Sequence, residues 1–358
     1  MASMMVQPAL MMSRHHPRRP PFVKHVKTGE RLNVGRIMLP IRHVAASSSH
    51  RDSRKPSVEQ VASAKDDRIA MTEVEKEKPI RPFWGREWLP NDVFRLVHFV
   101  GMHLVCLLAP FYFTWPAFWV GLSVAIITGL FGITLSYHRN LSHKSFNLPK
   151  WLEYTFAYCG VLACQGNPID WVSTHRFHHM FTDTDKDPHS PNEGFWFSHV
   201  KWVFDKTYLT AKCGEPDNVG DLRKQPFYRF IENTYYLHLI AFALLLYTAG
   251  GIPFFVWGVA MRAVIALHWT FLVNSVCHKW GKRAWNTSDS SMNNWWVALL
   301  TFGEGWHNNH HAFEYSARQG LEWWQIDITW GVIRMLEALG LATDVKLPTE
   351  QQKKQMAL

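Results

Sequence analysis

The chain of 358 residues has few cysteines, and their spacing fits neither disulfides nor metal binding. The five cysteines are odd in number, scattered, and without any C-x-x-C pair, which excludes a disulfide framework and a thiolate zinc site. The sequence also lacks the glycine fingerprint of a flavin or nicotinamide site and any fused haem-binding cytochrome segment. The chain therefore does not encode a redox cofactor site of these kinds.

Outside its first 51 residues the chain has almost no excess of positive charge. The net charge is +9, and residues 1–51 hold nine Lys or Arg against one acid, so that they contribute +8 and leave +1 for the rest. A basic face for nucleic acid is therefore excluded.

The N-terminal region has the composition of a targeting segment. Residues 1–50 are rich in Met, Ser, Arg, His and Pro, which is typical of an organelle transit peptide, and a disordered basic tail is the alternative. The uninterrupted apolar run of a secretory signal is missing, which disfavours export. Residues 51–80 carry dense mixed charge and are expected to be a disordered linker.

Four apolar stretches of about 20 residues are long enough to cross a bilayer as helices. They are Val93–Phe113, Pro116–Tyr137, Phe230–Ala249 and Phe254–Cys277. Because the links at 114–115 and 250–253 carry no charge, the stretches are expected to form two hairpins. Lys and Arg lie in the other loops, so the positive-inside rule predicts that the termini and the segment 138–229 share the cytoplasmic or stromal face. The predicted fold is an all-α membrane protein with four transmembrane helices in two hairpins and a helical cap on that face.

Other polar residues in the apolar regions are interpreted as structural. Trp151–Leu162 is too short to span and is expected to lie at the interface, and Arg262 must face protein rather than lipid. Lone histidines in or near the spans are expected to be hydrogen-bonded, inward-facing residues: His98, His103, His238 and His268.

Eight of the 20 histidines fall into three tight groups. They are His138 and His143 in H-R-N-L-S-H, His175, His178 and His179 in H-R-F-H-H, and His307, His310 and His311 in H-N-N-H-H. In H-x-x-H-H the three residues share one face of a helix, so their rings can converge on a metal. In H-x4-H the two positions lie about 140° apart on an α-helix, so one histidine is expected beyond the helix end.

Eight imidazoles exceed the positions around one ion, which favours two metals with room for water or O2. Two spans separate the first two groups from the third, so all three reach the same membrane face. Imidazole ligands alone leave Fe, Zn and Cu open. Interfacial histidines paired with carboxylates are the alternative without metal, and a metal transporter ranks low because the spans lack carboxylates.

Five stretches resemble one enzyme family. W-V-S-T-H-R-F-H-H, D-P-H-S, F-S-H-V, N-S-V-C-H and G-E-G-W-H-N-N-H-H are similar to the membrane fatty-acid desaturases of the Δ9 type, which include stearoyl-CoA desaturases and plant acyl-lipid desaturases. The resemblance covers Arg81 to Trp330. It defines a catalytic desaturase domain over 81–340 and a C-terminal tail over 341–358. The transit-like leader is similar to that of the plastid members.

The resemblance implies a di-iron site with nine histidine ligands, which adds His278 to the eight above, and Asn274 near one iron through water. It implies no further catalytic residue beyond the metal ligands. It also implies a narrow, bent tunnel for the acyl chain, with the bend at Gln165, Trp171 and Thr270.

This chain departs from the stearoyl-CoA enzymes at the substrate end. Ser173 and Thr174 stand where those enzymes have the Arg and Asp that hold coenzyme A, and Phe271 stands where they have Trp. The expected substrate is therefore an acyl chain, such as palmitoyl, esterified to a chloroplast glycerolipid. An acyl-CoA Δ9 desaturase is the alternative.

The expected reaction is the O2-dependent insertion of a cis double bond, with hydrogen removed by an oxidant made at iron because a methylene has no acidic proton. Electrons must then come from a partner, which is ferredoxin in a chloroplast membrane or cytochrome b5 in the endoplasmic reticulum membrane. A membrane di-iron hydroxylase or alkane monooxygenase shares the same ligand pattern and remains open.

Overall fold

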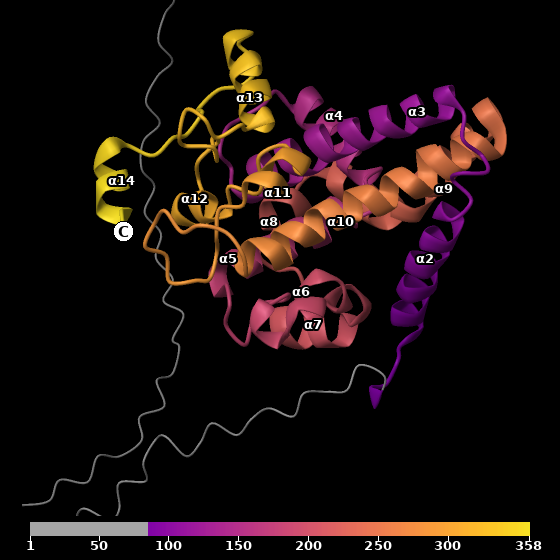
Figure 1. Ribbon diagram of the computed structural model, residues 1–358, viewed down its shortest axis with the longest axis horizontal. Coiled ribbons are helices and arrows are strands. Elements are labelled where there is room, and N and C mark those ends of the chain that lie inside the picture. The colour runs from indigo at the N-terminus through magenta and orange to yellow at the C-terminus, as the bar shows by residue number, and fades with distance from the viewer. Residues whose placement is uncertain (1–84) are drawn as a thin grey trace, which may run out of the picture. The chain divides into compact units, whose positions relative to one another are not determined.

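The computed structural model describes residues 85–358, so the expected transit peptide and linker lie outside the described residues. Within 85–358 the chain forms helices joined by turns, with isolated β-bridges and no β-strand (Figure 1). The expectation of a helical protein is confirmed for this part of the chain.

Two helical stretches are long and apolar enough to cross a membrane. The first joins α3 (Trp115–Ile126) to the π-helical η3 (Ile127–Ser142). The second runs through α9, η6, α10 and η7, which are Pro226–Phe254, Phe255–Met261, Arg262–Ser275 and Val276–His278. In Figure 1, α3, α9 and α10 extend in a similar direction away from the histidine-bearing part of the chain.

The second stretch is a hairpin rather than one straight helix. Gly251 has φ 64° and ψ −153°, which interrupts the helical backbone just before Pro253. A Cβ placed on Gly258 would lie 2.8 Å from Leu246 Cδ1, so the segments before and after the kink are in contact. Only glycine adopts this backbone conformation without strain, and the turn therefore falls where the G-G-I-P sequence predicts it.

The first expected span is shorter than predicted. Helix α2 covers Pro90–Cys106, which is 17 residues, and turns follow it at 107–112. At 1.5 Å per residue a helix of this length rises about 25 Å, less than the hydrocarbon core of about 30 Å. In Figure 1, α2 runs across the direction of α3, α9 and α10.

Helix α4 (Lys150–Val161) packs closely against η3 through two glycines. A Cβ on Gly132 would lie 2.4 Å from the backbone nitrogen of Gly160, and a Cβ on Gly160 would lie 2.4 Å from the Tyr137 ring. The absence of side chains at both positions lets the two backbones approach each other. This contact fixes the end of η3, where the first histidine group begins.

The cap consists of short helices between and after the long ones. Helix α5 (Pro168–Phe181) begins at Asn167, whose side chain accepts a hydrogen bond from the Asp170 amide. The others are η4 (Pro191–Glu193), α6 (Phe195–His199), η5 (Lys201–Phe204), α7 (Lys206–Cys213), α8 (Gly220–Arg223), α11 (Trp295–Leu300), α12 (His307–Ala312), α13 (Ile328–Ala338) and α14 (Glu350–Met356).

The C-terminal residues are tied to the cap. The Lys346 carbonyl accepts a hydrogen bond from the Ala317 amide, and Thr343 pairs with Asn147 in an isolated bridge. A second bridge joins Ala357 to Trp285. Residues 341–358 therefore contribute to the packing around the loops that carry the histidines.

Most polar groups in the apolar helices have protein partners, but His98 is exposed, so the expectation that it faces inward is wrong. Arg262 is buried, and its guanidinium donates to the carbonyls of Gly258 and Leu162, which confirms that it faces protein. The His238 ring lies 3.0 Å from Thr234 Oγ1 and 3.2 Å from Tyr158 Oη. Three further rings form a chain through α2, α10 and α6: His103 Nε2 lies 3.1 Å from His268 Nε2, and His268 Nδ1 lies 3.1 Å from His199 Nε2.

Candidate metal centre and acyl cavity

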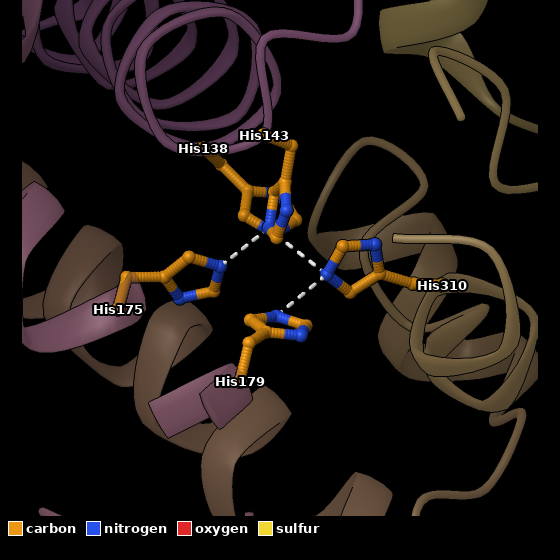
Figure 2. A group of neighbouring side chains, drawn as sticks. All are labelled: His138, His143, His175, His179 and His310. Carbon is orange, nitrogen blue, oxygen red and sulfur yellow. Dashed lines mark hydrogen bonds between the residues drawn. The ribbon is translucent and has the colours of Figure 1, made fainter. Parts of the chain in front are cut away.

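Five of the predicted histidines come together in a first cluster (Figure 2). His138 and His143 come from the end of η3, His175 and His179 from α5, and His310 from α12. The shortest contacts join Nε2 atoms: 2.8 Å between His143 and His175, and 3.0 Å from His310 to both His138 and His179. Figure 2 shows the five rings pointing at a common centre.

The other four predicted histidines form a second cluster next to the first. They are His178, His278, His307 and His311, and one nitrogen of each lies within 4.8 Å of the others. His307 Nε2 lies 3.0 Å from His278 Nε2 and 3.1 Å from His311 Nε2. The rings of His178 and His179, one from each cluster, are 5.4 Å apart. All nine predicted histidines are thus brought together in two adjacent groups.

Each H-x-x-H-H box divides its histidines between the two clusters in the same way. In α5 the i and i+4 residues, His175 and His179, enter the first cluster, and the i+3 residue, His178, enters the second. In α12 the i and i+4 residues, His307 and His311, enter the second cluster, and His310 enters the first. Positions i and i+4 are about 40° apart on a helix, whereas i+3 lies about 100° from i+4. One turn of helix can therefore serve two centres.

The H-x4-H pair converges because the helix is wound differently at its end. His143 directly follows η3, as expected, and its amide donates to the His138 carbonyl over 3.2 Å. This is the i→i+5 bond of a π-helix, which returns the chain to the same face after five residues. The angle of about 140° expected for an α-helix therefore does not apply.

In five of the rings, a carboxylate lies beside Nδ1, the nitrogen that points away from the cluster. His178 Nδ1 and His311 Nδ1 each donate over 3.0 Å, to Asp187 and Asp289 respectively. Glu304, Asp183 and Glu314 lie at Nδ1 of the remaining three, which are His138, His278 and His179. A proton held on Nδ1 leaves the Nε2 lone pair free, so these carboxylates set the tautomer in which Nε2 can bind a cation.

Burial keeps most of these imidazoles uncharged. Burial, and then repulsion between neighbouring imidazolium charges, hold the pKa values well below the usual range for His143, His175, His307, His310 and His311. Burial likewise lowers the pKa of His179 to about 4. His178 differs: burial acts to lower its pKa, but the Asp187 carboxylate outweighs this and raises it. Neutral imidazole is the form that binds metals.

A buried network of charged residues lies next to His138 of the first cluster. The Arg139 guanidinium donates to Glu304 over 2.9 Å and lies 2.9 Å from Asp327, and both carboxylates are buried or nearly so. It also donates to the Ala317 carbonyl over 2.8 Å. Although burial alone would raise the pKa of Glu304, the charges of His138 and Arg139 lower it. Glu304 therefore stays ionised and can orient His138.

Two cavities meet beside the clusters. The larger, of about 240 Å³, and the smaller, of about 60 Å³, share Gln165, Trp171, His175, Thr270 and Asn274 in their linings. Gln165 Oε1 accepts from Thr270 Oγ1 over 3.0 Å and from Trp171 Nε1 over 3.4 Å. The three residues predicted for a tunnel bend are therefore linked through Gln165 where the cavities meet.

The remaining predicted positions lie along the same cavities. Asn274 lines both of them and lies on α10, four residues before His278. Ser173, Thr174 and Phe271 line the larger cavity only.

Sequence reasoning missed the five carboxylates and His189. His189 belongs to none of the three histidine groups, yet it is buried, the centroid of its ring is 4.3 Å from that of His178, and it lines the larger cavity. The D-P-H-S and G-E-G-W-H stretches contain Asp187, His189 and Glu304, so the signal was present next to the ligand boxes. A lone acid has no helical periodicity, which is why spacing did not single it out.

The two clusters fit metal ions in spacing and in chemistry. Two nitrogen ligands at right angles, each about 2.1 Å from a metal, lie about 3.0 Å apart, and the Nε2 contacts here are 2.8–3.1 Å. Without a cation, the Nε2 lone pairs of His138 and His179 would both face His310 Nε2. A metal in the first cluster would remove this unfavourable arrangement.

Comparisons with known proteins identify the family. A family model described as "Fatty acid desaturase" matches residues 113–342. The chain is 63% identical over 293 residues to the chloroplastic palmitoyl-monogalactosyldiacylglycerol delta-7 desaturase of Arabidopsis thaliana, covering 81% of this chain and 78% of that protein. It is 60% identical to a probable chloroplastic lipid desaturase of the same plant, over 85% of this chain and 86% of the relative.

A third relative carries a different substrate in its name. It is the acyl-CoA C20 delta5-desaturase of Anemone leveillei, 57% identical over 84% of this chain and 96% of that protein. The family match and these identities agree with the histidine boxes and with the paired clusters. The chain is thus an oxidoreductase and belongs to the fatty acid desaturase family.

Proposed function

We propose that this desaturase holds one iron in each histidine cluster and uses O2 to insert a cis double bond into a palmitoyl chain esterified to a chloroplast glycerolipid. The observation that carries the proposal is the convergence of nine imidazoles, through Nε2, on two adjacent centres. Imidazole also suits Zn and Cu, and iron is inferred from the family. Asn274 would contact one iron through a water molecule.

The overall reaction balances with two external electrons. A –CH2–CH2– unit, O2, two protons and two electrons give –CH=CH– and two waters. When bound, the iron pair supplies the oxidising power that no side chain has. Ferredoxin is the electron donor expected in a plastid, because the chain has no cofactor site of its own to collect electrons from a nicotinamide.

The residues of the chain position one pair of carbons. An acyl chain is uniform, so selection must come from the shape of an apolar channel that presents one bond to the ions. Gln165, Trp171 and Thr270 form the hydrogen-bonded constriction between the two cavities, next to His175. They would bend the acyl chain there and exclude water from the reacting carbons.

Two residues of the larger cavity favour a lipid-linked chain over coenzyme A. Ser173 and Thr174 are uncharged, so they offer no charged partner to coenzyme A at these two positions, and the cations of the cavity, Arg95 and Lys206, come from other helices. The chloroplastic relatives named as lipid desaturases support the same substrate class. The acyl-CoA desaturase among the relatives keeps acyl-CoA as the second candidate.

We place the enzyme in a chloroplast membrane as a multi-pass protein. The two apolar stretches and the hairpin turn at Gly251 support three crossings, and α2 would supply the fourth with its flanking turns. The histidine clusters then lie on the stromal face, where the basic loops are expected. A transit peptide over 1–50, a linker over 51–80 and a desaturase domain over 81–340 complete the proposed organisation.

Lipid analysis tests the substrate and the reaction together. The chain would be expressed in leaf chloroplasts, and new double bonds located by derivatisation and mass spectrometry in separated galactolipid, phospholipid and acyl-CoA pools. We expect a new monounsaturated C16 chain in a chloroplast glycerolipid. New unsaturation confined to acyl-CoA would favour the second candidate, and a hydroxylated chain without unsaturation would indicate a hydroxylase.

Matched histidine variants separate ligands from structural histidines. His178→Ala should abolish the new product, whereas His238→Ala should retain it, because His238 hydrogen-bonds to Thr234 and Tyr158 and belongs to neither cluster. Product formation by His178→Ala would contradict the ligand assignment. A chain that moves metal ions across vesicles without altering lipids would instead be a transporter.

A further inference from the structure

One loop of the cap carries positive charge and no acid. Residues 279–288 include Lys279, Lys282 and Arg283 and neither Asp nor Glu. All three cations are exposed, and within residues 85–358 none of them has an ion pair, because Arg283 donates to carbonyl and hydroxyl oxygens only. We call residues 279–288 the cationic loop. Its charge is available to an anionic partner.

The cationic loop is hydrogen-bonded to the helix that carries the third histidine group. Trp285 Nε1 donates to Asn309 Oδ1 over 2.8 Å, and the Trp285 amide donates to Asn308 Oδ1 over 2.9 Å. These two asparagines lie between His307 and His310 on α12. In H-N-N-H-H the histidines therefore join the clusters, whereas the asparagines hold the loop.

Trp285 lies on a short route between the surface and the first cluster. Its ring is half-buried and meets the Phe313 ring edge to face, with the centroids 5.0 Å apart. Asn309, whose side chain accepts from the indole, directly precedes His310 of the first cluster. One hydrogen bond and the covalent bonds of α12 thus connect the indole to that histidine.

The proposed reaction needs a place where electrons enter. Two external electrons are used for each double bond, and the chain has no flavin or nicotinamide site of its own to collect them. A protein carrier must therefore dock close to the clusters. Opposite charges on two protein surfaces steer their encounter and fix their orientation. A carrier that docks on three exposed cations must present acidic residues.

We propose that the cationic loop binds the acidic face of a one-electron carrier protein, ferredoxin in a plastid, and that electrons enter through Trp285 and Asn309 to His310. This inference rests on the proposed desaturase function. Each carrier molecule is oxidised by one electron and the metal pair is reduced by one. Two encounters therefore supply the two electrons of the balanced reaction.

The docking is tested by binding of oxidised ferredoxin to the purified full-length protein, which requires no turnover. Lys279→Gln combined with Lys282→Gln should weaken binding by about 2- to 30-fold, as expected for two exposed charge pairs. The difference should shrink as salt is added. Lys224→Gln combined with Arg229→Gln is the matched control, because both residues are exposed and lie on another segment, around α8 and α9.

Equal binding by the two double variants would overturn the inference. An anionic membrane surface is the other partner that suits exposed cations. Unchanged ferredoxin binding by the loop variant, together with loss of co-purifying phosphatidylglycerol, would assign the loop to that surface and overturn the inference as well. Tighter binding of cytochrome b5 than of ferredoxin would contradict the choice of carrier.

The route through Trp285 is tested by anaerobic mixing of reduced ferredoxin with the iron-loaded protein, with the oxidation of ferredoxin followed by absorbance. Trp285→Leu should slow the oxidation while ferredoxin affinity and iron content stay unchanged. Trp285→Phe should recover part of the rate, because it keeps an aromatic ring beside Phe313. Trp323→Leu is the control, because Trp323 is 91% exposed and lies outside the loop.

An unchanged rate in Trp285→Leu, or an equal decrease in the Trp323 control, would contradict the route. If the unaltered chain forms no double bond in any lipid pool, the proposed function fails. The binding measurement distinguishes the two failures, because it reports on the cationic loop without any product.

Discussion

At the scale of single residues, each cluster depends on which ring nitrogen holds the proton. Asp187 and Asp289 accept from Nδ1 of His178 and His311, and burial of these carboxylates is outweighed by their histidine partners, which lower their pKa values. The acids therefore stay ionised, keep the Nε2 lone pairs available, and would balance part of the charge of a cation bound in the second cluster.

Asp289→Asn tests this role. The substitution removes the negative charge that lies beside His311 Nδ1 and replaces a carboxylate acceptor by an amide. Because this weakens the hold on the His311 tautomer, we expect iron affinity to fall by about 10- to 100-fold. Iron retained during dialysis against a graded chelator measures the change. Asp344→Asn is the control, because Asp344 is an exposed surface residue near Lys346. Equal iron retention by the two variants would contradict the role of Asp289.

The buried imidazoles also predict how the metal-free protein responds to acid. Burial lowers the pKa of His179 to about 4 in the folded chain, from 6.5, and lowers those of five other cluster histidines well below 6.5. Between these values the unfolded chain binds protons that the folded chain does not, so stability falls as pH decreases. The contribution of these histidines to stability is fully present above about pH 6.5 and is lost towards pH 4.

Thermal unfolding of chelator-treated protein in detergent, measured from pH 7.5 to 4.5, checks this expectation. The melting temperature should decrease steadily below about pH 6.5. A melting temperature that stays constant over this range would mean that the rings are solvated rather than packed together.

At this scale the sequence predicted which histidines cluster better than it predicted the residues around them. The i, i+3, i+4 spacing and the family resemblance singled out all nine histidines that the structure brings together. The angles between positions i, i+3 and i+4 on a helix explain why each box is divided between two centres. This division can be predicted only when the position of the second centre is known. The carboxylates lie in turns, such as the one in which Asp183 has φ +60°, where no periodic pattern marks them.

At the scale of elements, the crossing of η3 and α4 positions the first histidine box. The contact between Gly132 and the backbone at Cys159 and Gly160 leaves no room for a Cβ, since the nearest atoms would be 2.4–2.6 Å away. His138 and His143 follow on the same helix and at its end. A change in the distance between the two helices would therefore displace His138 and His143 in the first cluster.

Gly132→Ala should destabilise the fold by about 1–3 kcal/mol or more, because overpacking must push the two helices apart. Gly331→Ala on α13 is the control, since a Cβ there meets nothing within 4 Å. Alanine at that position should be neutral or stabilising by about 0.5–1 kcal/mol. Chemical unfolding of both variants measures the difference, and similar stabilities would contradict the proposed role of the crossing.

Element types were predictable from hydropathy, but winding and exact length were not. The apolar runs marked the helices, and the G-G-I-P sequence marked the turn at Gly251. The π-helical winding of η3 depends on tertiary contacts such as the glycine crossing, which composition does not show. Helix α2 ends at Cys106 and is followed by turns, although the apolar run continues to Phe113.

At the scale of the whole molecule, segments 172 residues apart in the sequence must meet on one side of the apolar helices. His138 lies beside His310, and both are buried. The predicted hairpins anticipated this meeting, because two helices between the boxes return the chain to its starting side. The sequence predicted two centres, but which histidine belongs to which centre became visible only once the boxes were packed together.

The central claim is that the two clusters hold one iron each, and the iron content of purified, folded protein measured by plasma mass spectrometry tests it most directly. We expect about two irons per chain in the unaltered protein, and about one in His310→Ala and in His307→Ala, which each disrupt a different cluster. An unaltered chain with one iron or none, or two irons retained in both variants, would contradict the claim.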